Sequence, residues 1–261
     1  YDDASIVVVI DEALHPVFEN HPAGITVMSP EKYSTTPMSD FVVFDVSVAC
    51  ANFESEFAPA ITKNRPEIWC EHIGMLSDHR SPTLYVTPEE KYRAGTIISE
   101  AIRKLGTQGI RLIGVGYRTQ DEWRDYPHMV ALVVELSKIE NVAVLLLDNG
   151  NIRETFSSNV VHLNRLSLRE LFACVSLCDA VVAPDTAHVH IAGALGVSQF
   201  AIFGPTDPSV RLADYTGLCT HPPLFEKCGR APCWYSPCAG TFCLSLLHPK
   251  KIRQRVEAML E

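Results

Sequence analysis

The chain has 261 residues, 47% of them hydrophobic and 20% charged, and it carries a formal net charge of −9. This composition is typical of a globular protein, and the length suits two medium-sized domains or one large one. The acidic charge argues against a general nucleic-acid or anionic-membrane partner, so an anionic ligand must be held by a local cationic site.

The cysteines and the lack of targeting signals bear on the cellular compartment. No apolar stretch is long enough to cross a membrane, and the residues after Tyr1 do not form a signal-peptide pattern. Four of the nine cysteines lie in apolar or helical contexts, which is typical of reduced thiols: Cys50, Cys70, Cys174 and Cys178. We therefore expect a cytoplasmic protein.

The first 86 residues alternate apolar runs with helix signals. Three runs have the length of strands: Ser5–Ile10, Ile25–Met28 and Asp40–Asp45 (DFVVFD). One helix is expected to open at Asp11 and to end before Pro22. A second should begin at Asn64, a good N-cap followed by Pro66 in the first turn. Residues 29–39 have the composition of a loop.

A single helix is expected to connect two domains. Thr87 and Glu90 are spaced as a capping box, with Pro88 at the first helical position, and apolar residues recur with helical spacing up to Gly106. We therefore assign residues 1–86 to an N-terminal domain, 87–108 to the crossover helix and 109–261 to a C-terminal domain.

The C-terminal domain alternates strands with helices. The expected strands are Ile110–Val115, Val142–Leu147, Val160–Leu163, Ala180–Ala183 and Gln199–Phe203. The expected helices are Pro127–Ile139 capped by Asp125, Leu168–Leu177 capped by Ser167 with Glu170, His188–Leu195, and a final helix at 249–260. Strands separated in this way pair in parallel through right-handed crossovers, so the predicted class is α/β.

Residues 178–208 combine a buried strand, a polar turn and a helix N-terminus. Asp185 and Thr186 supply N-cap chemistry, and the free amides of the first helical turn would favour an anion there. His190 lies one turn into an otherwise apolar helix. The alternative is an ordinary strand–helix–strand unit with a capping Asp-Thr pair and a core histidine.

The loop at residues 116–127 follows the first strand of the C-terminal domain. Ligands of open parallel sheets bind beyond the carboxyl ends of strands, and Arg118 and Arg124 lie in such a loop. Two guanidinium groups there would neutralise a diphosphate. The alternative is a solvated loop in which these arginines pair with Asp121, Glu122 or Asp125.

A cysteine-rich loop at residues 219–243 precedes the final helix. Its cysteines recur every five residues, at Cys228, Cys233, Cys238 and Cys243. Four thiolates suit a structural metal site, zinc first and iron as the alternative, although none of the spacings is C-x2-C. Two disulfides are the other interpretation.

The stretch from Ser167 to Pro208, with its Asp185-Thr186-Ala187-His188-Val189-His190 core, resembles glycosyltransferase family 9, the ADP-heptose:lipopolysaccharide heptosyltransferases and their relatives. It departs from the family pattern at Ala187, where the family usually has Gly. The resemblance implies a GT-B fold, in which two Rossmann-like domains face a cleft. The N-terminal domain would then lack its first strand and the loop that follows it.

The resemblance also implies an activity: inverting transfer of a sugar, a heptose, from a nucleotide diphosphate donor such as ADP-heptose to a glycan or protein acceptor. The donor-binding residues that it implies are Arg118, Arg124, Asp185, Thr186, Ala187 and His190. A charged His190 would favour the leaving nucleotide, and Asn149 and Asn151 would face the nucleoside. No organic cofactor is implied.

The catalytic base is not identified by the sequence. Asp11 and Asp45 are fallback candidates at strand ends, and the alternative is that both are helix or turn caps. A nucleotide-sugar epimerase, or a non-catalytic nucleotide-sugar-binding or scaffold protein of the same fold, stays open as an alternative function. The oligomeric state also stays open.

Overall fold

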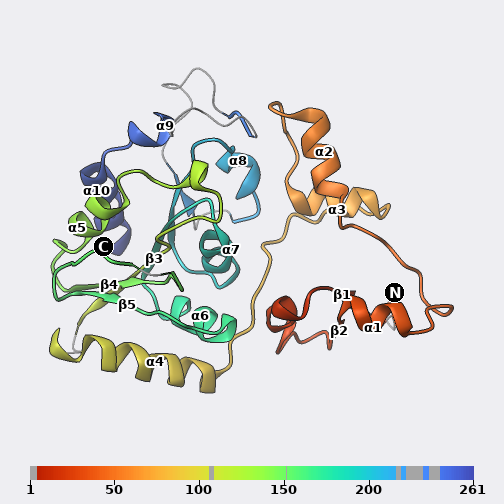
Figure 1. The fold of residues 1–261 in the computed structure, drawn as a ribbon, viewed down its shortest axis with the longest axis horizontal. Coiled ribbons are helices and arrows are strands. Elements are labelled where there is room, and N and C mark those ends of the chain that lie inside the picture. Colours follow the sequence, from red (N-terminus) through yellow and green to blue (C-terminus); the bar gives the residue numbers. More distant parts are fainter. Residues whose placement is uncertain (1–4, 106–108, 151, 216–218, 222–231, 235–241) are drawn as a thin grey trace.

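The computed structural model describes residues 5–105, 109–150, 152–215, 219–221, 232–234 and 242–261. Its centre is a six-stranded parallel sheet in the order β5-β4-β3-β6-β7-β8 (Figure 1). The strands are β3 (Arg111–Val115), β4 (Val142–Leu146), β5 (Val160–His162), β6 (Ala180–Pro184), β7 (Gln199–Ile202) and β8 (Cys219–Thr220). The five predicted strands are confirmed, and the short edge strand β8 was not predicted.

The strand order reverses between β3 and β6. The chain runs outward from β3 through β4 to β5, and then returns to place β6 on the other side of β3. Such a reversal opens a crevice beyond the carboxyl ends of the two central strands, where doubly wound folds bind their ligands. We therefore expect a ligand-binding site at the loops after β3 and β6.

Helices cover both faces of the sheet. One core joins the sheet to α4 (Pro88–Ile102), α6 (Leu168–Val175) and α7 (Ala187–Ala194). The opposite core joins it to α5 (Met129–Leu136) and α10 (Pro249–Leu260). The shorter helices are η2 (Arg103–Leu105), η3 (Glu122–Arg124), α8 (Pro208–Arg211) and α9 (Phe242–Ser245). No helix in the described ranges combines the length and apolarity needed to span a membrane.

The helix caps follow the sequence with one exception. Capping boxes at Thr87 and Ser167 open α4 and α6 as predicted. The predicted cap of α5 by Asp125 is wrong, because α5 begins after His128 without a side-chain cap. Asp125 instead accepts hydrogen bonds from the backbone N–H and hydroxyl of Thr119, at 2.6 and 2.8 Å, and so closes the loop after β3.

The N-terminal segment, residues 5–86, has little sheet of its own. Strands β1 (Val7–Val9) and β2 (Thr26–Met28) form a parallel pair, joined by the 3-10 helix η1 (Glu12–Phe18). The other elements are α1 (Pro30–Thr35), α2 (Ala49–Phe57) and α3 (Arg65–His72). In Figure 1 this segment, red to orange, lies beside the unit built on the six-stranded sheet.

Two expectations for this segment are corrected. Asp40–Asp45 is not a strand: it pairs with no strand of the described chain, and Val42 is 83% exposed. An apolar run becomes a strand only where a partner satisfies its backbone groups, and the sheet of the N-terminal segment ends at β2. Residues 29–39 are not all loop, because Ser29 caps α1 and Pro30 occupies its first turn.

A largely buried arginine, Arg169, connects the N-terminal segment to the crossover helix. Arg169 of α6 makes a bidentate pair with Glu90 of α4, with both N···O distances 2.7 Å. The same guanidinium donates to the backbone oxygens of Pro16 and Tyr85, at 3.1 and 2.6 Å. One side chain therefore ties η1 and the interdomain linker to the helix layer.

Candidate active site

A cavity of about 690 Å³ lies at the carboxyl ends of β3 and β6. Its walls come from the loop after β3, the start of α7, the region around α8, and α2 and α3 of the N-terminal segment. All six predicted donor-binding residues line it: Arg118, Arg124, Asp185, Thr186, Ala187 and His190. The cavity therefore gathers residues that are far apart in the sequence at the reversal of strand order.

Thr186 begins α7, and its hydroxyl is fully engaged. The oxygen accepts from the backbone N–H of His188 at 3.3 Å and lies 3.2 Å from Nδ1 of that ring. His188 Nε2 is 2.6 Å from the backbone oxygen of Leu147, which only accepts, so Nε2 carries the proton. Nδ1 is then an acceptor, and the Thr186 hydroxyl donates to it. Two amides of the first turn of α7 are also bonded to Thr186, the His188 N–H to its hydroxyl and the Val189 N–H to its backbone oxygen, so an anion at this end is favoured by the helix dipole rather than by these groups.

Gly116 lets the end of β3 approach α7 closely. A Cβ atom at this position would lie 2.8 Å from Nδ1 of His188 and 2.9 Å from Cβ of Ala183. A larger residue would displace His188 and, through it, Thr186. The glycine after β3 is therefore required by the geometry of the site.

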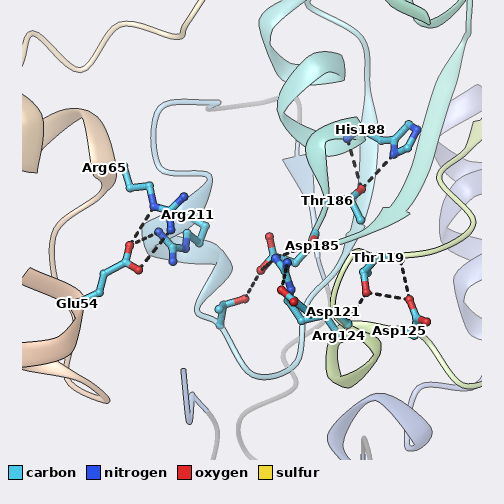
Figure 2. Close-up of polar contacts among 11 residues, drawn as sticks. Glu54, Arg65, Thr119, Asp121, Arg124, Asp125, Asp185, Thr186, His188 and Arg211 are labelled. Carbon is cyan, nitrogen blue, oxygen red and sulfur yellow. Dashed lines mark hydrogen bonds and ion pairs between the residues drawn. The ribbon is translucent and has the colours of Figure 1, made fainter. Parts of the chain in front are cut away.

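Arg124 joins the loop after β3 to the turn after β6 (Figure 2). Its Nη1 donates to the backbone oxygen of Asp185 at 3.1 Å and lies 3.5 Å from Oδ2 of the same residue. Its Nη2 pairs with Oδ2 of Asp121 at 2.6 Å. Asp185 is buried and also accepts from the Thr206 hydroxyl at 2.7 Å. The pairing with Asp121 was the alternative that the sequence left open for Arg124.

Arg118 is the other cation at this edge. Its backbone N–H donates to Asp148 Oδ2 at 3.1 Å, and its guanidinium lies 5.8 Å from the ring centroid of Tyr117. The side chain is exposed and lines the cavity. Among the residues that the structure describes, no carboxylate forms an ion pair with it. Arg118 therefore offers a positive charge to a ligand more readily than Arg124 does.

His190 is half-buried in the cavity wall, with its ring 5.9 Å from that of Tyr215. Burial lowers its pKa, the cations Arg211 and Arg65 lower it further, and Asp185 opposes the shift. The pKa of His188 is also lowered, mainly by burial. A lowered pKa disfavours the charged form of His190, on which the expected attraction to the leaving nucleotide depends.

The opposite wall is an ion cluster that sequence reasoning missed. Glu54 of α2 is 2% exposed and accepts from Nε and Nη2 of Arg65, at 3.0 and 3.3 Å. Arg211 of α8 donates to the same carboxylate at 2.6 Å and lies 4.6 Å from the ring centroid of Trp234 (Figure 2). No local motif marks this cluster, because Glu54 and Arg211 are 157 positions apart.

Part of the cavity lies in a segment that is similar to a known family. The sequence model of glycosyltransferase family 9 (heptosyltransferase) matches residues 146–218, which include the turn after β6 and the start of α7. The match covers this part of the C-terminal domain and not the rest of the chain. No curated protein sequence matches it closely enough to count as a relative.

Solved structures show that the chain has the GT-B fold, as predicted. A family 9 glycosyltransferase from Veillonella parvula is 15% identical with a TM-score of 0.68, covering 98% of this chain and 88% of its own. E. coli ADP-heptose lps heptosyltransferase II is 13% identical with a TM-score of 0.59, covering 100% and 90%. TibC from enterotoxigenic E. coli, an iron-containing dodecameric glycosyltransferase, is 10% identical with a TM-score of 0.60, covering 98% and 68%.

The departure from the family pattern at Ala187 has a simple structural reading. Ala187 is the exposed first residue of α7, and its backbone is not in the left-handed region that favours glycine. Alanine therefore fits this position without strain.

The fallback bases lie outside the cavity, whereas Asn149 lines a second cavity of about 390 Å³ that shares Arg118 and His188 with the first. Asp11 caps η1 through Ala13 N–H at 2.8 Å, and Asp45 accepts from the hydroxyl and N–H of Ser47, at 2.6 and 2.9 Å. These bonds lower the pKa of Asp45, and neither carboxylate lines the cavity. Asn149 exchanges two 3.1 Å hydrogen bonds with the backbone of Leu166, which holds its amide in the loop. Asn151 lies outside the described residues.

Half of the predicted metal ligands fall within the described residues. Cys233 is half-buried and Cys243 is buried, whereas Cys228 and Cys238 lie outside the described ranges. Cys243 packs against Gly204, where a Cβ atom would lie 2.8 Å from its Sγ. The residues that are described contain no cluster of three or more metal-binding side chains. The four-cysteine site therefore stays a prediction.

Proposed function

We propose that this glycosyltransferase moves a heptose from ADP-heptose to a glycan or protein acceptor with inversion at the sugar carbon. The observation that carries the proposal is the placement of the family motif, from Asp185 to His190, in a 690 Å³ cavity at the reversal of strand order. TibC, which shares the fold, has been solved in complex with ADP-D-beta-D-heptose. This similarity supports the choice of donor.

The donor's diphosphate would lie between α7 and the two arginines of the loop after β3. The first-turn amides of α7 carry the positive end of the helix dipole, and Arg118 adds a cation without a carboxylate partner in the described chain. Arg124 adds a second guanidinium, already oriented by Asp185. These groups would stabilise negative charge on the departing nucleotide, which is the electrostatic requirement of the transfer.

The first test is ADP binding by calorimetry at two salt concentrations. Arg118→Ala should weaken binding about ten- to a hundredfold, since a charged hydrogen bond is worth about 1.5–3 kcal/mol. Arg124→Ala should weaken it about tenfold, because Asp121 already compensates part of that charge. Added salt should weaken binding by the wild type more than by either variant.

Two further variants sharpen this test. Thr186→Ala should change ADP binding only a few-fold, because the hydroxyl is neutral and bonded to His188. Arg153→Ala removes an exposed arginine that does not line the cavity, and it should bind ADP like the wild type. Wild-type affinity in both Arg118→Ala and Arg124→Ala would refute the placement of the diphosphate.

A second candidate function is nucleotide-sugar binding without transfer. The acidic side chains of the cavity are all engaged: Glu54 with two arginines, Asp121 and Asp185 with Arg124, and Asp214 with Asn64 at 3.2 Å. A general base must be free to take a proton from the acceptor hydroxyl, and each of these carboxylates is already bonded to another side chain. This pairing is the observation that favours a binding role.

Release of ADP from ADP-heptose separates the candidates. Release that requires an acceptor supports transfer, whereas binding without release supports the second candidate. Conversion of the bound sugar without release of ADP would identify an epimerase, the remaining alternative.

We also propose that Cys228, Cys233, Cys238 and Cys243 hold a structural zinc or iron ion; the iron in TibC supports this. The purified protein should contain about one metal ion per chain, since four thiolates complete such a site. Cys233→Ser should lower metal content and thermal stability, whereas Cys70→Ser, a thiol outside this loop, should change neither. Metal-free protein, or two intact disulfides in the native mass spectrum, would contradict the proposal.

A further inference from the structure

Asp121 forms an ion pair with Arg124 in the cavity wall. Its carboxylate oxygen Oδ2 is 2.6 Å from Arg124 Nη2, and both side chains line the cavity. The other terminal nitrogen, Nη1, is held by the backbone oxygen of Asp185 at 3.1 Å. Figure 2 shows the guanidinium between these two acidic residues. Asp121 therefore pairs with the guanidinium nitrogen, Nη2, that an anionic ligand in the cavity would contact.

The backbone of Asp121 is fixed, while its side chain is open to solvent. Its carbonyl oxygen accepts from the Thr119 hydroxyl at 2.5 Å and from the Arg124 N–H at 2.9 Å. The side chain is 47% exposed. Rotation of this carboxylate into water therefore leaves the loop after β3 unchanged.

The charges around Arg124 do not suit a diphosphate as they stand. One guanidinium faces the carboxylates of Asp121 and Asp185, so this group of three has a net charge of about −1 when all are ionised. Asp185 is buried and bonded to Thr206, whereas Asp121 is exposed. Exposed ion pairs are weak, so Asp121 is the partner that yields most easily.

We propose that Asp121 is a positioning residue that orients Arg124 in the empty cavity and is displaced from Nη2 by a phosphate oxygen of a nucleoside diphosphate. Asp121 thereby sets the affinity for the donor and keeps Arg124 in one conformation between turnovers. This inference rests on the proposed donor site. It assigns a role to a carboxylate that the family motif does not include.

The test compares ADP binding by the wild type, Asp121→Asn and Glu122→Gln, measured by calorimetry at low salt. Asp121→Asn should bind ADP about two- to fivefold more tightly, because the competing ion pair is gone. A purely structural role for Asp121 predicts weaker binding. Glu122→Gln removes the same charge from the adjacent exposed residue, which does not line the cavity, and should bind like the wild type.

A double variant tests whether Asp121 acts through Arg124. In the Arg124→Ala background, Asp121→Asn should give a clearly smaller gain in affinity than it gives in the wild type. An equal or weaker affinity of Asp121→Asn, or an equal gain in Glu122→Gln, would overturn the inference. Failure of the wild type to bind ADP would instead contradict the proposed function.

Discussion

Replacing Arg169 with methionine is expected to lower the free energy of unfolding at pH 7 by about 3 kcal/mol. The side chains of Arg169 and Glu90 are 12% and 10% exposed, so the substitution leaves a nearly buried carboxylate without its partner. It also removes the donors to the backbone oxygens of Pro16 and Tyr85. Urea denaturation of the variant and the wild type measures the difference.

The pH dependence of stability gives an independent readout of the same pair. Hydrogen bonds from Arg169 lower the pKa of Glu90 to about 2, against an ordinary value of 4.5, while burial opposes the shift. Because the folded-state pKa is the lower one, the stabilisation is complete above about pH 4.5 and is lost as the pH falls towards about 2. In Arg169→Met, most of this loss of stability at acid pH should disappear.

The matched control for Arg169 is Arg93→Ala. Arg93 pairs with Glu89 on the exposed side of the same α4 helix, where the side chains are 64% and 78% exposed. Such a pair is worth about 0.3–0.5 kcal/mol. If Arg169→Met is no less stable than Arg93→Ala, the contacts that Arg169 makes do not hold the N-terminal segment in place.

Glu54→Gln is the second substitution with a large expected effect, again about 3 kcal/mol of unfolding free energy. The Glu54 carboxylate is 2% exposed and neutralises both Arg65 and Arg211, of which Arg211 is only 12% exposed. Glutamine keeps the shape but leaves two guanidinium groups without their counter-ion. Chemical denaturation, followed by limited proteolysis within residues 49–72, measures the loss of stability and the loosening of α2 and α3.

Glu56→Gln is the control for this experiment. Glu56 lies on the same helix, is exposed and does not line the cavity. Its substitution should change stability by less than about 0.5 kcal/mol, as is usual for surface positions. Equal stability of Glu54→Gln and Glu56→Gln would show that the ion cluster contributes nothing to the docking of the N-terminal segment.

Local features of the fold were predictable from the sequence. Capping boxes such as Thr87 with Glu90 act over four residues, and the final helix was predicted with the bounds that it has, Pro249–Leu260. Strands β4 and β6 were predictable because both of their faces are buried and their sequences are continuously apolar. Residues Asp40–Asp45 have a similarly apolar composition but pair with no strand in the described chain. Composition alone does not show whether a segment has a strand to pair with.

The candidate site was predictable only as far as its motif extends. The turn at Asp185-Thr186 and the helix after it are contiguous in the sequence. The partner of the Thr186 hydroxyl was not predictable, because the tautomer of His188 depends on the carbonyl of Leu147, 41 positions away. The lowered pKa of His190 likewise depends on burial and on Arg211 and Arg65, which surround it only in the folded chain.

The docking of residues 5–86 sets an order in which the protein folds during its synthesis. This segment buries few apolar side chains, namely Met28, Ala49, Cys50, Ile61 and Ile68. Its polar contacts with the rest of the chain are made by Arg169, Arg211 and Asp214. The ribosome adds these residues more than 80 positions after the end of the segment. Domains that carry their own core fold as units, so the six-stranded unit folds first. Residues 5–86 are therefore synthesised before the six-stranded unit but are protected from proteases after it.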